Sequence, residues 1–355
     1  MDYQQKLLDL KNRSNTLRND IQKDIKRNEH YISVLNNTSS ILDDLDEKFK
    51  LQTGLTDTDI SLMFVAIGLQ IARQYLFSNE KYRISSNQGD MLAKNMLSPL
   101  PRTASEILTQ SVPYDAIATG AHISDTGLSG TTHRFRTLGH DPILGWIFGT
   151  ANIITNSLTK NDFVTTYQIS NNKIIRHYPL GTMHMLNNSI EYSKRDPIIL
   201  PTALARQAIH FGSDYFTKQG LPIPIISTVN ESLAKEMISK WHIDMYSVTR
   251  SAGLSIFINN IISLIHQLFY NGNNTDLDYK LYEVRTKKII LYSNLIASSS
   301  NVAVVALTKD LSKLDIGGIG VCIYQYITSK EFIRAVKEEF IFGQYKEIFL
   351  TEKNI

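Results

Sequence analysis

The residues best able to do chemistry gather between positions 125 and 146, in the segment DTGLSGTTHRFRTLGHDPILGW. Histidine and aspartate together supply an acid or base that works near neutral pH, and arginine supplies a fixed positive charge that suits phosphate oxygens. The candidate catalytic residues are Asp125, His133, His140 and Asp141, and the candidate substrate-binding residues are Thr131, Thr132, Arg134 and Arg136. We therefore expect this segment to bind an anionic, phosphate-containing substrate.

The backbone around these residues favours the same interpretation. Gly127 and Gly130 would let the chain approach a ligand closely. Proline is favoured at the first position of a helix and aspartate at the N-cap, so we expect a helix to begin at Pro142, capped by Asp141, with its positive end toward the site. A purely structural interpretation stays open: the aspartate only caps, the two arginines pair with acids elsewhere, and the histidines are satisfied core residues.

A second His–Asp pair lies further along the chain, at His210 and Asp214. Their spacing of four places both on one face of a helix, which suits a metal pair or an oriented His–Asp couple. HExxH and every cysteine-based zinc template are missing, so no metal ligands are assigned, and a divalent metal ion is kept only as an open cofactor. His133 and His140 are seven apart and would align only on a continuous helix, which this stretch does not favour.

Composition limits the function classes further. The chain has 355 residues, of which 43% are hydrophobic, and its 37 basic and 34 acidic residues nearly balance, so we expect a sizeable core and no nucleic-acid partner. Cys322 is the only cysteine, which favours a reducing compartment, and we expect the cytoplasm. Residues 61–77 and 253–270 are apolar but contain Gln, Arg, Asn or His, so we expect buried or amphipathic helices, with peripheral membrane contact open.

The elements that must position the candidate residues are mostly helices. Residues 1–50 place Leu and Ile at helical spacing, and Asn36, Asn37 and Thr38 can turn the chain, which predicts an N-terminal helical hairpin. We expect this hairpin to assemble copies or bind a partner protein, with folding onto its own body as the alternative. Residues 114–130 are rich in Gly, Ser and Thr, which predicts an ordered loop, and long ordered loops often carry function.

One short sheet is expected among the helices. Residues 165–178 alternate β-branched and polar residues around two asparagines, a pattern typical of a β-hairpin. We therefore predict a mainly α protein. Residues 1–97 would form the N-terminal hairpin with the helix that follows it, and residues 98–355 a helical body that contains the central loop–helix segment.

Three stretches resemble uncharacterised bacterial proteins of the mobile, phage-defence or toxin-effector kind: THRFRTLGHDPILGWIFGTANI, YSNLIASSSN and LDIGGIG. A helical body with dispersed His, Asp and Arg also resembles the Wnt-related lipocone enzymes, and that resemblance implies action on phosphate-bearing lipid headgroups. No motif of either group maps onto this chain residue by residue, so no catalytic role is carried over. We expect a bacterial defence or effector enzyme, a phosphoesterase or phosphotransferase; the alternative is a non-catalytic oligomerising or ligand-sensing protein.

Overall fold

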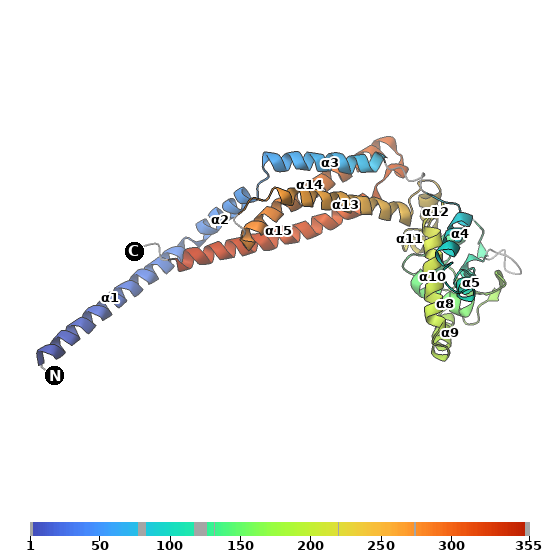
Figure 1. The fold of residues 1–355 in the computed structure, drawn as a ribbon, viewed down its shortest axis with the longest axis horizontal. Coiled ribbons are helices and arrows are strands. Elements are labelled where there is room, and N and C mark those ends of the chain that lie inside the picture. The colour runs from blue at the N-terminus through green and yellow to red at the C-terminus, as the bar shows by residue number, and fades with distance from the viewer. Residues whose placement is uncertain are drawn as a thin grey trace. The chain divides into compact units, whose positions relative to one another are not determined.

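The computed structural model describes residues 3–76, 83–116, 126–130, 132–218, 220–272 and 275–351. Helices dominate these residues, and the sheet among them is small, so the predicted mainly α fold is confirmed. Figure 1 shows the elements in the order in which the chain passes through them.

The chain forms two compact units, each assembled from separate stretches. Unit 1 contains Met1–Leu69, Ile258–Ile296 and Cys322–Ile355, and unit 2 contains Gln70–Phe257 and Ala297–Val321. The boundaries fall within four long helices: α3 (Asp57–Leu76), α13 (Met245–Leu268), α14 (Asp276–Thr308) and α15 (Ile316–Leu350). The division at residue 98 that the sequence suggested stays a prediction.

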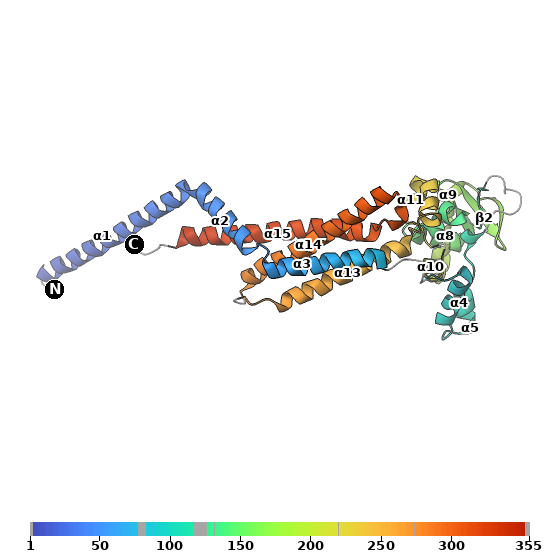
Figure 2. The ribbon, with the colours of Figure 1, turned by 90° about the horizontal axis from the view of Figure 1, so that it is seen from above.

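Unit 1 begins with the two helices expected from residues 1–50. These are α1 (Tyr3–Asn36) and α2 (Thr38–Gln52), which Asn37 alone separates. They meet at an open bend, and α2 leads away from α1 instead of folding back along it as the predicted hairpin would (Figure 1, Figure 2). Along α1 the Leu and Ile side chains from Leu7 to Leu35 are exposed, whereas Val34 is buried. Phe49 of α2 is buried among apolar side chains of α14 and α15, which fixes the end of this helical pair.

The core of unit 1 lies between α3, α13 and α14, which run side by side in both views (Figure 1, Figure 2). The buried side chains there are Leu62, Ala66, Ile262, Ile289 and Ile290. α13 and α14 are each long and apolar enough to cross a membrane by length and composition.

Unit 2 is built from shorter elements that surround one sheet. Its helices are α4 (Ser86–Met96), α5 (Arg102–Leu108), α7 (His133–Arg136), α8 (Gly145–Thr155), α9 (Gly181–Arg195), α10 (Ile199–Tyr215), α11 (Ile226–Val229) and α12 (Glu231–Ser239), with short 3-10 helices η2 (Pro113–Asp115), η3 (Leu138–His140) and η4 (Leu311–Lys313). α8 packs against both α9 and α10.

The sheet confirms the predicted hairpin and extends it. Strands β2 (Thr166–Ser170) and β3 (Lys173–His177) pair antiparallel, and β1 (Ser157–Thr159) adds a third antiparallel strand beside β2. The turn residues Asn171 and Asn172 have φ angles of 51° and 56°, a left-handed conformation that asparagine tolerates better than most residues. The sequence did not predict β1, because three residues are too few to show an alternating pattern.

Gln207 of α10 joins the helices of unit 2 around the candidate residues. Its side chain is fully buried, and a Cβ at Gly149 of α8 would lie 2.5 Å from its Oε1 atom, so only glycine allows this approach. The amide accepts a hydrogen bond from the Tyr114 hydroxyl at 2.6 Å and donates one to the Gly139 carbonyl at 3.0 Å. α10, η2 and η3 are thereby locked together at one point.

Candidate metal centre

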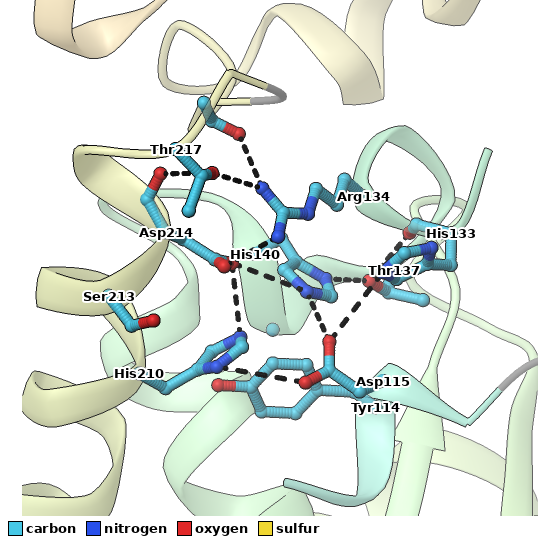
Figure 3. A network of polar contacts seen from close by, with 12 residues as sticks. Tyr114, Asp115, His133, Arg134, Thr137, His140, His210, Ser213, Asp214 and Thr217 are labelled. Atoms are coloured by element: carbon cyan, nitrogen blue, oxygen red, sulfur yellow. Dashed lines mark hydrogen bonds and ion pairs between the residues drawn. The ribbon is translucent and has the colours of Figure 1, made fainter. Parts of the chain in front are cut away.

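Three histidines and two aspartates of unit 2 converge on that point, as Figure 3 shows. Asp115 comes from η2, His133 from α7, His140 from η3, and His210 and Asp214 from α10. In the described part of the chain, ligand atoms of Asp115, His140 and His210 all lie within 4.8 Å of one another, close enough to share one metal ion. The sequence candidates His133, His140, His210 and Asp214 therefore meet, joined by one residue that was not a candidate.

Tyr114 forms the floor of this centre. Its ring is fully buried and meets His140 and His210 edge to face, with ring centroids 4.9 and 5.3 Å away. A Cβ at Gly139 would lie 2.4 Å from the Tyr114 ring, so the ring occupies its place only because residue 139 is glycine. Tyr114 in turn directs the next residue, Asp115, toward the histidines (Figure 3).

His133 and His140 come together without the continuous helix that their spacing seemed to require. α7 is a single turn that ends at Thr137, whose backbone is extended, and η3 begins immediately after it. This break brings the two rings to a centroid distance of 5.1 Å in an edge-to-face contact. The helical-spacing rule therefore missed the pair, because the chain changes direction between its members.

Thr137 determines which nitrogen of His140 faces the centre. The threonine hydroxyl has one proton, and the His133 carbonyl at 2.9 Å can only accept it. While the hydroxyl donates to that carbonyl, His140 Nδ1 donates its proton to Thr137 Oγ1, at 2.6 Å; a hydroxyl turned toward the ring would instead make Nδ1 the acceptor and put the ring proton on Nε2. Burial lowers the pKa of His140 to about 3, although Asp115 opposes this, so the ring is neutral at physiological pH. A neutral ring with its proton on Nδ1 presents a lone pair at Nε2.

That lone pair meets another acceptor. His140 Nε2 lies 2.9 Å from Oδ1 of Asp115. Burial raises the pKa of Asp115, but the neighbouring histidines outweigh it and hold the pKa well below its usual range, so this carboxylate is ionised. In the tautomer with the proton on Nδ1, Nε2 and Oδ1 are two acceptors at hydrogen-bond distance that a cation would bridge; in the other tautomer, Nε2 donates to the carboxylate.

His133 is oriented in the same way. Its Nδ1 lies 3.0 Å from the carbonyl of Ser129, which can only accept a proton. Nε2 then faces Oδ1 of Asp115 at 3.6 Å. A backbone carbonyl that fixes one ring nitrogen while the other points into the site is the usual support for a histidine near a metal ion.

His210 and Asp214 lie on one face of α10, so the predicted helical spacing is confirmed. His210 Nε2 is 3.2 Å from Asp214 Oδ2, and its Nδ1 is 3.7 Å from Oδ2 of Asp115. Both His210 Nε2 and Asp214 Oδ2 are buried, and apart from this contact with each other, which lacks the geometry of a hydrogen bond, neither has a hydrogen-bond partner among the described residues. Buried polar atoms without partners are rare, and their aim into one centre points to a missing ligand.

Arg134 holds Asp214 from the other side. Its guanidinium donates to Oδ1 of Asp214 at 2.6 Å, to the Thr217 hydroxyl at 3.1 Å and to the Gly220 carbonyl at 3.2 Å. Burial raises the pKa of Asp214, against the opposing charges of His210 and Arg134.

The remaining sequence candidates have other places. Asp141 caps the turn before α8, accepting from the amides of Ile143 and Leu144 at 2.9 Å, and it also accepts from Ile225. The helix was predicted to begin at Pro142, but α8 begins at Gly145. Residues 142–144 form a turn before it, closed by the hydrogen bond from the Gly145 amide to the Asp141 carbonyl.

The candidate substrate-binding residues are mostly engaged elsewhere. Arg136 pairs with Glu231 and donates to the Gly127 carbonyl, so both arginines pair with acids, as the structural interpretation had it. The Thr132 hydroxyl donates to the Gly127 carbonyl at 3.1 Å. Asp125 and Thr131 lie outside the described residues.

Asp115 is the residue that sequence reasoning missed. It lies in a stretch without periodicity, and a lone acid there gives no spacing to interpret. The one available signal was Pro113 at the start of η2, which marks a turn and places Asp115 at its end.

Comparison with known proteins adds no relative. No family model, no curated protein and no solved structure matches this chain. The resemblances to phage-defence proteins and to lipocone enzymes therefore stay predictions, and the function must be argued from the centre itself.

Proposed function

We propose that Asp115, His140 and His210 bind one divalent transition-metal ion and that the chain is a metal-dependent hydrolase of a phosphate-containing substrate. The observation that carries the proposal is the cluster itself, in which one ligand atom from each of Asp115, His140 and His210 lies within 4.8 Å of the other two. Two imidazoles and one carboxylate form a ligand set that suits zinc and leaves a coordination position open, as catalytic zinc sites do.

The residues around the proposed metal ion would have separate roles in the hydrolysis. A bound divalent ion lowers the pKa of water to about 7 and polarises a phosphoryl oxygen. His133, whose side chain is 12% exposed, is placed to accept a proton from the attacking water. The water oxygen forms the new bond to phosphorus, the ester P–O bond breaks, and His133 returns the proton to the leaving oxygen. Asp214 keeps His210 oriented.

Arg136 supports a phosphate-containing substrate. It lies one helical turn after His133 on α7, and its side chain is 30% exposed, whereas Arg134 is buried. Its present partner, Glu231, is 34% exposed, and a surface pair of this kind contributes little to stability. A substrate phosphate can therefore replace the glutamate, and the guanidinium would then bind two of its oxygens.

Metal content is the first test. Elemental analysis of the purified full-length chain should give about one equivalent of zinc or another transition metal per chain. Asp115→Asn keeps the shape of the side chain but removes its charge, and His210→Ala removes a ligand, so both should fall well below one. His184→Ala, a histidine of α9 outside the centre, is the matched control and should stay at one. A wild-type chain that neither retains nor takes up metal refutes the centre.

Activity is the second test, made with bis(p-nitrophenyl) phosphate as the probe. We expect turnover that a chelator removes and zinc restores, and a loss of at least a hundredfold in His133→Ala with metal content unchanged. Arg136→Ala should raise KM more than it lowers kcat. If each of the single variants His133→Ala, Arg136→Ala and His140→Ala kept full activity, the hydrolase would be refuted even if the wild-type chain binds metal.

A second function, assembly of copies, is favoured by α1. On this helix of 34 residues, seven Leu and Ile side chains recur at intervals of three, four or seven residues, and each is between 51 and 66% exposed: Leu7, Leu10, Leu17, Ile21, Ile25, Ile32 and Leu35. Such a stripe is stable in water when a second helix covers it, and an identical helix has the matching stripe.

Light scattering of the full-length chain tests this assembly. The double variant Ile21→Lys and Ile25→Lys should reduce the mass in solution to that of one chain. Asn12→Lys with Asn19→Lys adds the same charge on the opposite face of α1 and should leave the mass unchanged. A wild-type mass of one chain, or a multiple that survives the Ile21 and Ile25 changes, would exclude α1 as the assembly element.

A further inference from the structure

Two helices of the chain carry long uncharged stretches. In α13, residues 251–268 contain no Asp, Glu, Lys or Arg, and the same holds for residues 289–308 of α14. At a rise of about 1.5 Å per residue, each stretch is roughly 27–30 Å long, which matches the hydrocarbon thickness of a bilayer.

Polar side chains in and beside these stretches contact one another, and His266 also contacts the Asp59 carboxylate of α3 at 2.8 Å. Asn294 of α14 donates to Asn259 Oδ1 of α13 at 2.9 Å, and His266 of α13 contacts the Thr286 hydroxyl of α14 at 2.7 Å. All four side chains are buried. These contacts pair the end of α13 with the start of α14, so the two helices form an antiparallel hairpin with a polar seam.

The outer faces of the same helices are apolar and uncovered. Phe257 and Leu264 of α13 are 61 and 62% exposed, and Ile296 and Val302 of α14 are 45 and 49% exposed. Only 17% of the most apolar stretch of α13 is buried within the described part of the chain. The sequence predicted a buried or an amphipathic helix here, and the buried helix is therefore wrong. The inside of the bundle holds apolar side chains as well as the polar seam, so the feature that sets it apart from a water-soluble bundle is the uncovered apolar outer face.

The extent of this apolar surface favours lipid over a second copy as its occupant. Exposed large apolar side chains also occur on α3 and α15, the other two long helices: Phe64, Val65, Ile323 and Ile327. A standard protein interface covers about 800 Å² of each partner, whereas a bilayer covers every outward face of a bundle.

The charges at one end of the hairpin agree with a lipid occupant. Lys287 and Lys288 immediately precede the uncharged stretch of α14. Lys330 follows the apolar part of α15. Val336 of α15 packs in one cluster with Val284 of α14, so Lys330 lies at the same end of unit 1 as Lys287 and Lys288. Acids lie at the same end, among them Glu283, which pairs with Lys287, and Glu331, so the charges there mark a water-facing end of the helices and not a basic patch.

We propose that α13 and α14 insert into a lipid bilayer as a membrane-spanning hairpin, with the Asn259–Asn294 seam inside and the apolar faces toward the acyl chains. This inference is independent of the metal centre. It predicts that the full-length chain, expressed in bacteria, sediments with the membranes, resists extraction by carbonate at high pH and requires detergent for purification.

Lysine substitutions distinguish lipid from water on the outer faces. A lysine at the centre of a spanning helix disfavours insertion by roughly a hundredfold, while the same lysine on a water-exposed helix face costs almost nothing. Phe257→Lys combined with Ile296→Lys should therefore shift most of the chain out of the carbonate-resistant fraction. Leu51→Lys, at an 81% exposed position of α2, is the matched control and should behave as the wild type.

Three results would overturn the hairpin. The first is a wild-type chain that stays soluble and monodisperse without detergent. The second is complete release by carbonate, which indicates a peripheral protein. The third is membrane retention that the Phe257 and Ile296 lysines leave unchanged. A soluble dimer whose mass falls to one chain in the same lysine variant would assign the apolar faces to a second copy instead.

Discussion

The hydroxyl of Thr137 offers the sharpest test of the proposed centre, because it acts on the metal only through His140. Thr137→Val replaces a buried threonine by a side chain of nearly the same shape and removes one oxygen. His140 Nδ1 loses the hydroxyl partner that it now has at 2.6 Å. The ring then loses the contact that orients its Nε2 atom toward Asp115.

The expected effect follows from the role of such supporting hydrogen bonds. Removing the partner of a metal-binding histidine typically lowers metal affinity by about 10- to 100-fold, or about 1.4–2.7 kcal/mol. Leaving a buried donor unpaired also destabilises the fold, by about 1–3 kcal/mol. We therefore expect Thr137→Val to bind zinc at least tenfold more weakly while the chain still folds.

Competition with a zinc-binding indicator dye measures this affinity directly, and thermal unfolding of the metal-free chain measures the stability separately. Thr155→Val is the matched control, since Thr155 is also a buried threonine but its hydroxyl bonds to Ala151 and Ser157. It should lower stability without changing zinc affinity. If Thr137→Val and the control bind zinc equally well, the hydroxyl does not orient a ligand, and the assignment of His140 fails.

Three further outcomes are expected, each from a different contact of unit 2. In the metal-free chain, the lowered His140 pKa means that between pH 6.5 and 4.5 the ring takes up a proton only in the unfolded state. Urea unfolding should therefore show the free energy of unfolding decreasing, as the pH is lowered over this range, by up to about 1.4 kcal/mol per pH unit. His140→Asn should reduce that slope. Arg134→Met leaves the Asp214 carboxylate buried without its cation and should cost about 3–5 kcal/mol, measured by the same unfolding, with part recovered when Asp214→Asn is added. Asn172→Val should lower thermal stability by about 1–2 kcal/mol because its φ is positive, whereas Asn172→Gly should not; equal losses would place the strain elsewhere.

Sequence reasoning reached those features whose cause is local. Asp141 caps the turn that starts at Pro142, His210 and Asp214 share a helical face, and the two asparagines at 171 and 172 turn the β-hairpin. In each case the residues that decide the structure lie within four positions of one another, so their spacing alone carries the information.

The parts that depend on distant contacts were out of reach. The place of Asp115 depends on Tyr114 lying against Gly139 and on Gln207 tying them to α10, which no local pattern shows. The arginine at 134 looked like a substrate ligand because a sequence does not reveal that Asp214 balances its charge. For the same reason, the apolar pattern of α13 could not tell a buried helix from an uncovered one.

The order in which the ligands are synthesised has a consequence for how the centre is filled. Asp115 and His140 precede His210, which lies behind the whole three-stranded sheet and α9 in the chain. At about 5–20 residues per second, a ribosome needs several seconds to pass from the first ligand to the last. In the proposed metal centre, an incomplete pair of ligands would bind an ion only weakly during that time, so selection among ions would wait until α10 has docked on α8.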